Sequence, residues 1–559
     1  MLRIPVAAAI VALVVPLAAA QQKKGAAPKK GDSPPGILTF PATEKLLPNG
    51  LKVIVVPTGF PNIVSLQIPV KTGSRNEVEP GKSGFAHFFE HMMFRGTVEY
   101  PPERYQGILT QVGARQNAYT TDDYTNYHTT FSKDDLELML KVEADRFQNL
   151  SYEPAAFKTE ARAVLGEYNK NSANPLLKLD EAQREKAYTT HTYKHTTMGF
   201  LKDIEGMPNQ FAYSREFFQR WYRPEYTTVI VAGDVKADEV IRLVEKYWGG
   251  WKAGSYRAAI PQEPPAKGPV YTHVEWPTAT LPWVSVAFHG PAFSDRKKEF
   301  AAVDMLFDLS FGETSDLYKK LVETDQTVDQ LFTDTGANED PSLLTVYARV
   351  KKLEDALSVR DQILQTYAAA AAAPVDAQRL ADAKSNARYG FARRLDNTET
   401  IAATLARFVR YTRSYDTLNN LYRVYASLRP ADLQAAAQTY FTDANLVVAT
   451  LSKDAMPQAI AQAPALATFA RKAAPADSDL DLLIQKTTLP QLNVKLLFAV
   501  GSEHDPKGKE GLAALAASMI AEAGSKERRI DEINKALYPM AGSFRDQVDK
   551  ELTTFTGSM

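Results

Sequence analysis

The chain has 559 residues, more than one hydrophobic core usually organises, so we expect several domains. Apolar residues make up 45% and charged residues 23% of the sequence, a balance typical of folded globular proteins, which excludes wholesale disorder. The formal charge of -1 gives no global attraction to nucleic acid, so a nucleic-acid partner is not expected. Cysteine is absent, which excludes disulfides, thiolate catalysis and thiolate-bound metal.

The N-terminus has the pattern of an export signal. An arginine near the start precedes an apolar run at 4–17, and three alanines end at residue 20. This run is short for a membrane span, and small residues suit a signal peptidase, so we predict a cleavable signal peptide over 1–20 and a flexible lead-in over 21–42. An uncleaved anchor is the alternative. The predicted location is the periplasm, or otherwise the exterior, with no stable membrane insertion after cleavage.

Two stretches of similar layout follow the lead-in. Each begins with short apolar strands, continues through helical patterns and ends on another apolar strand, which predicts an α+β unit over 43–258 and a second over 268–470. Their ends match in spacing and pattern, at 222–232 and 440–450. Such self-similarity indicates that the two units are repeats.

The C-terminal part restarts the pattern of the first unit. We predict a linker over 471–484 and a partial third unit over 485–559, in which 511–519 aligns with 84–92. Three polar residues of the first unit are replaced there by Ala514, Ala517 and Ser518. Because the last residues read as a strand inside an unfinished sheet, we expect the sequence to be a piece of a longer chain.

One apolar helical segment of the first unit carries three polar residues. His87 and His91 are four positions apart, so a helix places both imidazoles on one face. Glu90, next to His91, is better placed as a base for water at a metal than as a third ligand. Phenylalanine and methionine surround these residues, and burying them without a metal or a partner would be costly. A hydrogen-bonded core cluster is the alternative interpretation.

The order His-x-x-Glu-His is the inverted zinc-peptidase motif, and the chain resembles the pitrilysin/insulysin/mitochondrial processing peptidase (M16) family of metallopeptidases. In that family a glutamate 76 residues after the second histidine completes the zinc site, which here is Glu167. The resemblance therefore implies one Zn2+ per chain, bound by His87, His91 and Glu167. It also implies a supporting catalytic role for Glu160, seven residues earlier, and Glu90 as the catalytic base.

The resemblance also implies the fold and the activity. Family members have repeated α+β domains, each a mainly antiparallel β-sheet flanked by α-helices, the LuxS/MPP-like metallopeptidase fold. The implied reaction is zinc-dependent endopeptidase hydrolysis of peptides or unfolded proteins. These substrates add as a strand beside the zinc, and the matching segment makes Asn117, Ala118 and Tyr119 the predicted substrate-binding residues.

One feature of the family is missing from the second unit. The family places an arginine and a tyrosine near the zinc from the opposite half of the assembly, but the aligned residues here are Val322 and Asp329. We therefore expect a second half-shell from a missing C-terminal region or a partner subunit. The rival hypotheses are a peptide-binding or chaperone-like module with structural zinc, and an incomplete subunit that needs a partner for activity.

Overall fold

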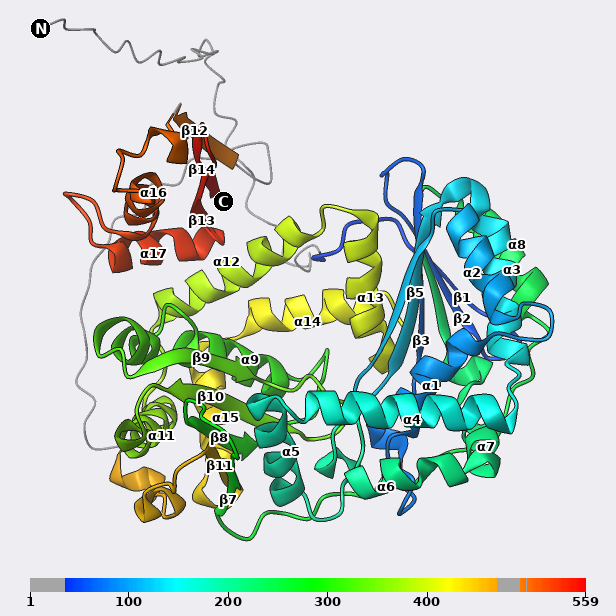
Figure 1. The fold of residues 1–559 in the computed structure, drawn as a ribbon, viewed down its shortest axis with the longest axis horizontal. Helices are drawn as coiled ribbons and strands as arrows, with labels where there is room; N and C mark the ends of the chain where they lie inside the picture. Colours follow the sequence, from blue (N-terminus) through cyan, green and yellow to red (C-terminus); the bar gives the residue numbers. More distant parts are fainter. Residues whose placement is uncertain (1–35, 470–492, 499) are drawn as a thin grey trace, which may run out of the picture. The chain divides into compact units, whose positions relative to one another are not determined.

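The computed structural model describes residues 36–469, 493–498 and 500–559. The predicted signal peptide, most of the predicted lead-in and the predicted linker lie outside these residues. Among the helices within the described ranges, none is long and apolar enough to cross a bilayer. The described chain forms three β-sheets flanked by helices (Figure 1), which confirms the predicted α+β class.

The first sheet has six strands in the spatial order β1-β2-β6-β3-β5-β4. Neighbouring strands are antiparallel, except that β2 and β6 run parallel. The strands are β1 (Thr43–Leu46), β2 (Lys52–Pro57), β3 (Ile63–Val70), β4 (Arg115–Thr120), β5 (Thr125–Ser132) and β6 (Thr228–Gly233). Within the described chain β4 pairs with β5 alone, so its other side is a free sheet edge.

Eight helices accompany the first sheet and form the first repeat with it. Val53 and Val55 of β2 point into a core shared with several of these helices. The helices are α1 (Phe85–Met92), α2 (Pro102–Gln111), α3 (Leu136–Asn149), α4 (Pro154–Asn171), α5 (Pro175–Ala187), α6 (Leu201–Gly206), α7 (Phe211–Trp221) and α8 (Ala237–Trp248). Because β2 is also buried on its opposite face, its sequence is a continuous apolar run rather than an alternating one.

The second repeat has the same strand arrangement, in the order β7-β11-β8-β10-β9 with β7 and β11 parallel. Its strands are β7 (Val270–Glu275), β8 (Trp283–His289), β9 (Val328–Asp334), β10 (Leu343–Val350) and β11 (Leu446–Ser452). Its helices are α9 (Lys298–Phe311), α10 (Asp316–Tyr318), α11 (Ala356–Ala372), α12 (Ala377–Arg394), α13 (Thr398–Thr412), α14 (Asp416–Ser427) and α15 (Pro430–Tyr440). The order matches β2-β6-β3-β5-β4 strand for strand.

Each of these two repeats covers a sheet of the other. Helix α13 of the second repeat packs on β3 and β6, and Ile54 and Val56 of the first sheet join the core of the second repeat. In return, α5 of the first repeat packs on β7 and β11, and Leu179 belongs to one buried cluster with Trp283 of β8 and Leu451 of β11. Burial of apolar surface on both exchanged helices joins the two repeats tightly.

The C-terminal residues form a smaller sheet of the same kind. Its order is β12-β14-β13, as in β3-β5-β4, and its elements are β12 (Asn493–Phe498), α16 (Leu512–Glu522), α17 (Ile530–Leu537), β13 (Ser543–Val548) and β14 (Thr553–Ser558). Asp505 accepts the backbone N–H groups of Gly511 and Ala513 at the start of α16. A carboxylate caps α1 in the same manner, as described below, so the likeness extends to local hydrogen bonds.

Candidate metal centre and active site

Helix α1 carries the inverted motif, and its start is fixed by one buried carboxylate. Gly84 precedes the helix with a φ of 92°, a conformation that glycine adopts without strain. The carboxylate of Glu77 accepts hydrogen bonds from the backbone N–H of Gly84, at 2.7 Å, and of Ala86, at 2.6 Å. These bonds satisfy donors that the start of a helix leaves without a partner. Burial raises the pKa of Glu77 to about 8, against the effect of these two bonds. The helix is therefore anchored at its N-terminus.

Two histidines of α1 and one glutamate of α4 converge. The Nε2 atom of His87 lies 3.6 Å from Oε2 of Glu167, and that of His91 lies 3.3 Å from the same oxygen. One ligand atom from each of the three residues lies within 4.8 Å of the others. Phe88 and Phe89 are fully buried, so α1 is held on its apolar sides while the histidine face turns towards α4.

This donor set suits zinc. Two imidazole nitrogens and one carboxylate oxygen are ligands that Zn2+ accepts, and three protein ligands leave the open fourth position of catalytic sites. Burial, and then the neighbouring His91, lower the pKa of His87 to about 4, so this imidazole is in its neutral, metal-binding form near pH 7. The residues present therefore fit the metal that the resemblance implies.

Glu160 lies behind His91, on the side of the ring away from Glu167. Its Oε1 atom is 3.0 Å from His91 Nδ1, and Arg95 Nε donates to its Oε2 atom at 2.6 Å. Burial opposes ionisation of Glu160, but the bonds with His91 and Arg95 outweigh it and lower its pKa. The same bond raises the pKa of His91. Glu160 thus contacts the second ring nitrogen of His91 and is not in the three-residue cluster.

Glu90 lies next to the cluster but outside it. Thr120, the last residue of β4, donates its hydroxyl to Glu90 Oε2 at 2.7 Å. Burial raises the pKa of Glu90, in spite of this bond. A carboxylate at the boundary between the three convergent residues and a free sheet edge is in position to exchange protons with a peptide lying along that edge.

The predicted substrate-binding residues lie in the middle of β4. Asn117 is exposed, Ala118 is buried and Tyr119 is half-buried. The N–H group of Ala118 donates to the side chain of Asn117 at 2.9 Å rather than to β5, so it faces the free edge. The hydroxyl of Tyr119 is hydrogen-bonded to that of Tyr124 at 2.9 Å, which ties β4 to the turn before β5. The outward N–H group of Ala118 therefore lies two residues before Thr120, which bonds to Glu90.

The sequence did not single out Thr120 or Arg95. Arg95 follows His91 by four residues, the spacing of helix neighbours, which is a signal for a shared face. Thr120 directly follows the predicted substrate-binding residues, but its bond to Glu90 spans 30 residues and depends on how β4 meets α1.

The second repeat contributes neither an arginine nor a tyrosine at the two aligned positions. Val322 lies in a π-helical turn over Lys319–Thr324. Asp329 lies on β9 and forms an ion pair with Arg349 at 2.7 Å. These two positions therefore cannot supply the pair that the family places near the zinc.

Comparison with known proteins identifies the family that this chain resembles. The family described as "Insulinase (Peptidase family M16)" matches residues 53–200, and "Peptidase M16 inactive domain" matches residues 212–387. The zinc protease PqqE of Helicobacter pylori is 27% identical over 404 residues, which are 71% of this chain and 89% of that protein. The first match contains every candidate metal and catalytic residue named above.

A second relative is longer than this chain. The probable zinc protease PqqL of Escherichia coli is 30% identical over 220 residues, which are 37% of this chain and 23% of PqqL. The crystal structure of that periplasmic protease superposes with a TM-score of 0.65 at 18% identity, covering 93% of this chain and 64% of the other, which shows a shared fold. Since the two family matches together span most of residues 53–387, this chain belongs to the M16 family of peptidases.

Proposed function

We propose that this protein is an exported zinc-dependent endopeptidase, which hydrolyses peptides or unfolded segments bound as an added strand along β4. The main support for this proposal is that His87, His91 and Glu167 converge while Glu90 lies outside their cluster. A structural zinc site closes with four protein ligands and gains nothing from a free carboxylate beside it. The three-ligand set and the adjacent Glu90 therefore support catalysis by one bound zinc.

The roles follow from the contacts of each side chain. The chemistry that zinc supplies when bound is polarisation of the scissile carbonyl and acidification of nearby water. Glu90 takes a proton from the attacking water and delivers it to the leaving amine, and its raised pKa brings it closer to the pH at which it works. Glu160 keeps His91 in one orientation, and Arg95 keeps Glu160 ionised.

Substrate recognition through β4 fits a protease with broad sequence tolerance. An extended peptide pairs with a free sheet edge through its backbone, so its side chains contribute little to the pairing itself. The outward N–H of Ala118 becomes available once the side chain of Asn117 moves aside. The bound peptide then runs past Thr120 towards Glu90.

Export and a second half-shell complete the proposal. The N-terminal signal pattern and the periplasmic description of the E. coli structure support a periplasmic location. Since Val322 and Asp329 replace the expected arginine and tyrosine, these groups come from a further region of the protein or from a partner subunit. The three-stranded C-terminal sheet has the same order as part of the first sheet, which supports a further region of the same kind.

The test is hydrolysis of a mixed fluorogenic peptide library by zinc-loaded protein beginning at Gln21, beside its Glu90→Gln variant. We expect the parent to cleave, and the variant to keep zinc but lose roughly 100- to 10,000-fold in rate. Equal turnover by both would remove Glu90 from the role of base. Peptide binding without cleavage by the parent would instead favour a peptide-binding module, or a subunit that needs its partner.

A further inference from the structure

The turn between β4 and β5 is held from outside the first sheet. Asp123 in this turn is 2% exposed, and its Oδ1 atom accepts the hydroxyl of Tyr193 at 2.5 Å. Its Oδ2 atom accepts the backbone N–H of Glu339 at 2.9 Å and lies 3.8 Å from the guanidinium of Arg410. We call Asp123 with Tyr193, Glu339 and Arg410 the Asp123 clamp.

Two members of the Asp123 clamp belong to the second repeat. Glu339 lies in the loop between β9 and β10, and Arg410 lies on α13. The guanidinium of Arg410 stacks over the ring of Tyr124 at 4.5 Å and bonds to the carbonyl of Ala337 in the same loop. The second repeat therefore contacts the turn through two of its elements, the β9–β10 loop and α13.

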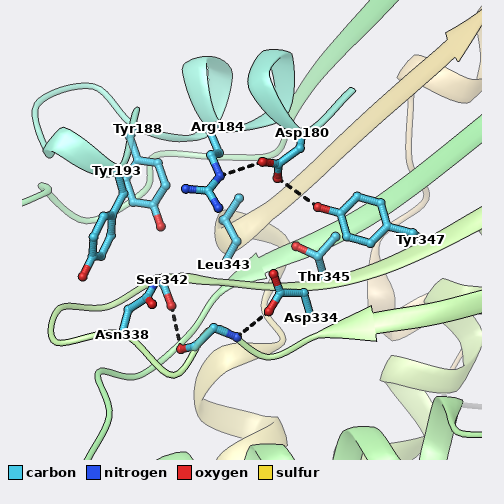
Figure 2. Close-up of a pocket in the computed structure, with 11 residues that line it drawn as sticks. Asp180, Arg184, Tyr188, Tyr193, Asp334, Asn338, Ser342, Leu343, Thr345 and Tyr347 are labelled. Carbon is cyan, nitrogen blue, oxygen red and sulfur yellow. Dashed lines mark hydrogen bonds and ion pairs between the residues drawn. The ribbon is translucent and has the colours of Figure 1, made fainter. Parts of the chain in front are cut away.

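The neighbouring residue of the turn is held as well. Arg184 of α5 donates to both carboxylate oxygens of Asp122, at 3.0 and 2.9 Å. Arg184 also pairs with Asp180 at 2.9 Å, and Asp180 accepts the hydroxyl of Tyr347 on β10 at 3.0 Å. Figure 2 shows the contacts of Asp180 with Arg184 and Tyr347 along a cavity between the repeats, whose volume of about 30 Å³ has room for ordered water.

The β4–β5 turn also fixes the position of the last residue of β4. The N–H of Thr121 donates to the carbonyl of Tyr124 at 2.8 Å, so the four residues 121–124 form a closed turn. Thr120 immediately precedes it and donates to Glu90. A shift of this turn therefore moves the hydroxyl that holds Glu90.

The carboxylate of Asp123 lies in the interior of the protein. Burial raises the pKa of Asp123 to about 6, although Arg410 opposes this effect, so ionised Asp123 is costly to keep in the interior. The bonds from Tyr193 and from the backbone of Glu339, with the nearby guanidinium of Arg410, offset this cost and join segments of the two repeats.

We propose that the second repeat, which lacks the metal motif, positions the catalytic base: the Asp123 clamp fixes the β4–β5 turn, and Thr120 is the positioning residue that the turn presents to Glu90. The proposal rests on the proposed function in so far as Glu90 is the base. It gives the second repeat a part in the reaction besides covering the first sheet.

The test compares two Tyr→Phe variants of the zinc-loaded protein. Tyr193→Phe removes the bond to Asp123, together with the 3.3 Å bond from the backbone N–H of Asp340, whereas Tyr425→Phe removes a partly buried bond to Asp304, 2.7 Å long and within the second repeat. We expect Tyr193→Phe alone to raise amide hydrogen exchange over 115–124 and to lower kcat about tenfold, with KM changed less and zinc content unchanged.

Two variants of Thr120 test its bond to Glu90 without changing the contacts between the two repeats. Thr120→Val keeps the shape but loses the hydroxyl, and we expect a fall in kcat of about tenfold and a changed acidic limb of the pH profile of kcat. Thr120→Ser keeps the hydroxyl and is expected to stay within about twofold of the parent.

If amide hydrogen exchange over 115–124 is the same in Tyr193→Phe as in the parent, the Asp123 clamp does not fix the turn. If the exchange rises but kcat stays at the parent value, fixing the turn does not position the base. Parental kcat in Thr120→Val would overturn the role of Thr120. If the parent cleaves no peptide, the proposed function fails, and the exchange comparison between Tyr193→Phe and Tyr425→Phe judges the clamp by itself.

Discussion

The Nδ1 atom of His91 lies 3.0 Å from Oε1 of Glu160, so the ring has one nitrogen held by a carboxylate while the other faces Glu167. Loss of such a supporting carboxylate typically weakens metal binding. We expect Glu160→Gln to reduce zinc affinity about 10- to 100-fold, measured by competition with a chromophoric chelator. Glu216→Gln, which removes an exposed ion pair with Arg220, is the control. Equal affinities in Glu160→Gln and the parent would contradict the supporting role.

Zinc is expected to stabilise the first repeat because its predicted ligands join α1 to α4. At a zinc concentration a thousandfold above the dissociation constant, the gain is about 4 kcal/mol. Calorimetry with and without chelator should therefore show a melting transition several degrees higher in the zinc-loaded protein. Glu167→Gln should lose most of this difference, while Glu90→Gln should keep it. A chelator-independent transition in the parent would argue against a site that bridges the two helices.

The proposed binding of a peptide along β4 can be tested by removing one backbone N–H group, that of Ala118. The N–H of Ala118 faces the free edge, and edge strands tolerate proline where the N–H is not part of the ladder. Ala118→Pro is therefore expected to raise KM for peptides by about tenfold or more while zinc content stays the same.

Asn117→Ala is the matched variant for this test. It frees the N–H of Ala118 from its side-chain acceptor, so KM is expected to stay equal or fall. Unchanged KM in the folded Ala118→Pro variant would show that peptides bind elsewhere.

Asp340 is expected to make the free energy of unfolding depend on pH. Burial opposes its ionisation, but the bonds with His191, at 3.0 Å, and Arg75, at 2.5 Å, outweigh burial and lower its pKa to about 2. The unfolded value is about 3.9, so between these values the folded state binds fewer protons than the unfolded state. The stabilisation is therefore complete above about pH 4 and is lost as the pH falls towards 2.

Asp340→Asn measures this contribution. We expect the free energy of unfolding in urea to fall by up to about 2 kcal/mol at pH 7, with the difference from the parent shrinking between about pH 4 and pH 2. Asp134→Asn, on an exposed side chain, should stay within about 0.5 kcal/mol. A difference that is the same at pH 7 and pH 2 would rule out the charge of Asp340 as its origin.

The sequence predicted the repeated α+β fold from two similar runs of strands and helices, and the six-stranded and five-stranded sheets share one strand order. The spacing of His87 and His91 determined their common face, because 3.6 residues per turn bring positions four apart together. The resemblance then supplied Glu160 and Glu167, whose carboxylates the structure brings to the two sides of His91. The catalytic and metal-binding roles of these residues stay predictions.

Tertiary structure decided the contacts that join separate elements. The bond from Thr120 to Glu90, the exchange of α5 and α13 between repeats, and the contacts of Arg410 with the β4–β5 turn connect residues from 30 to more than 300 positions apart. Local periodicity fixes which residues share a helix face or strand face, since it depends only on backbone geometry. Which faces then meet depends on strand order and on the burial of apolar surface across the whole fold, and no short stretch of sequence contains that information.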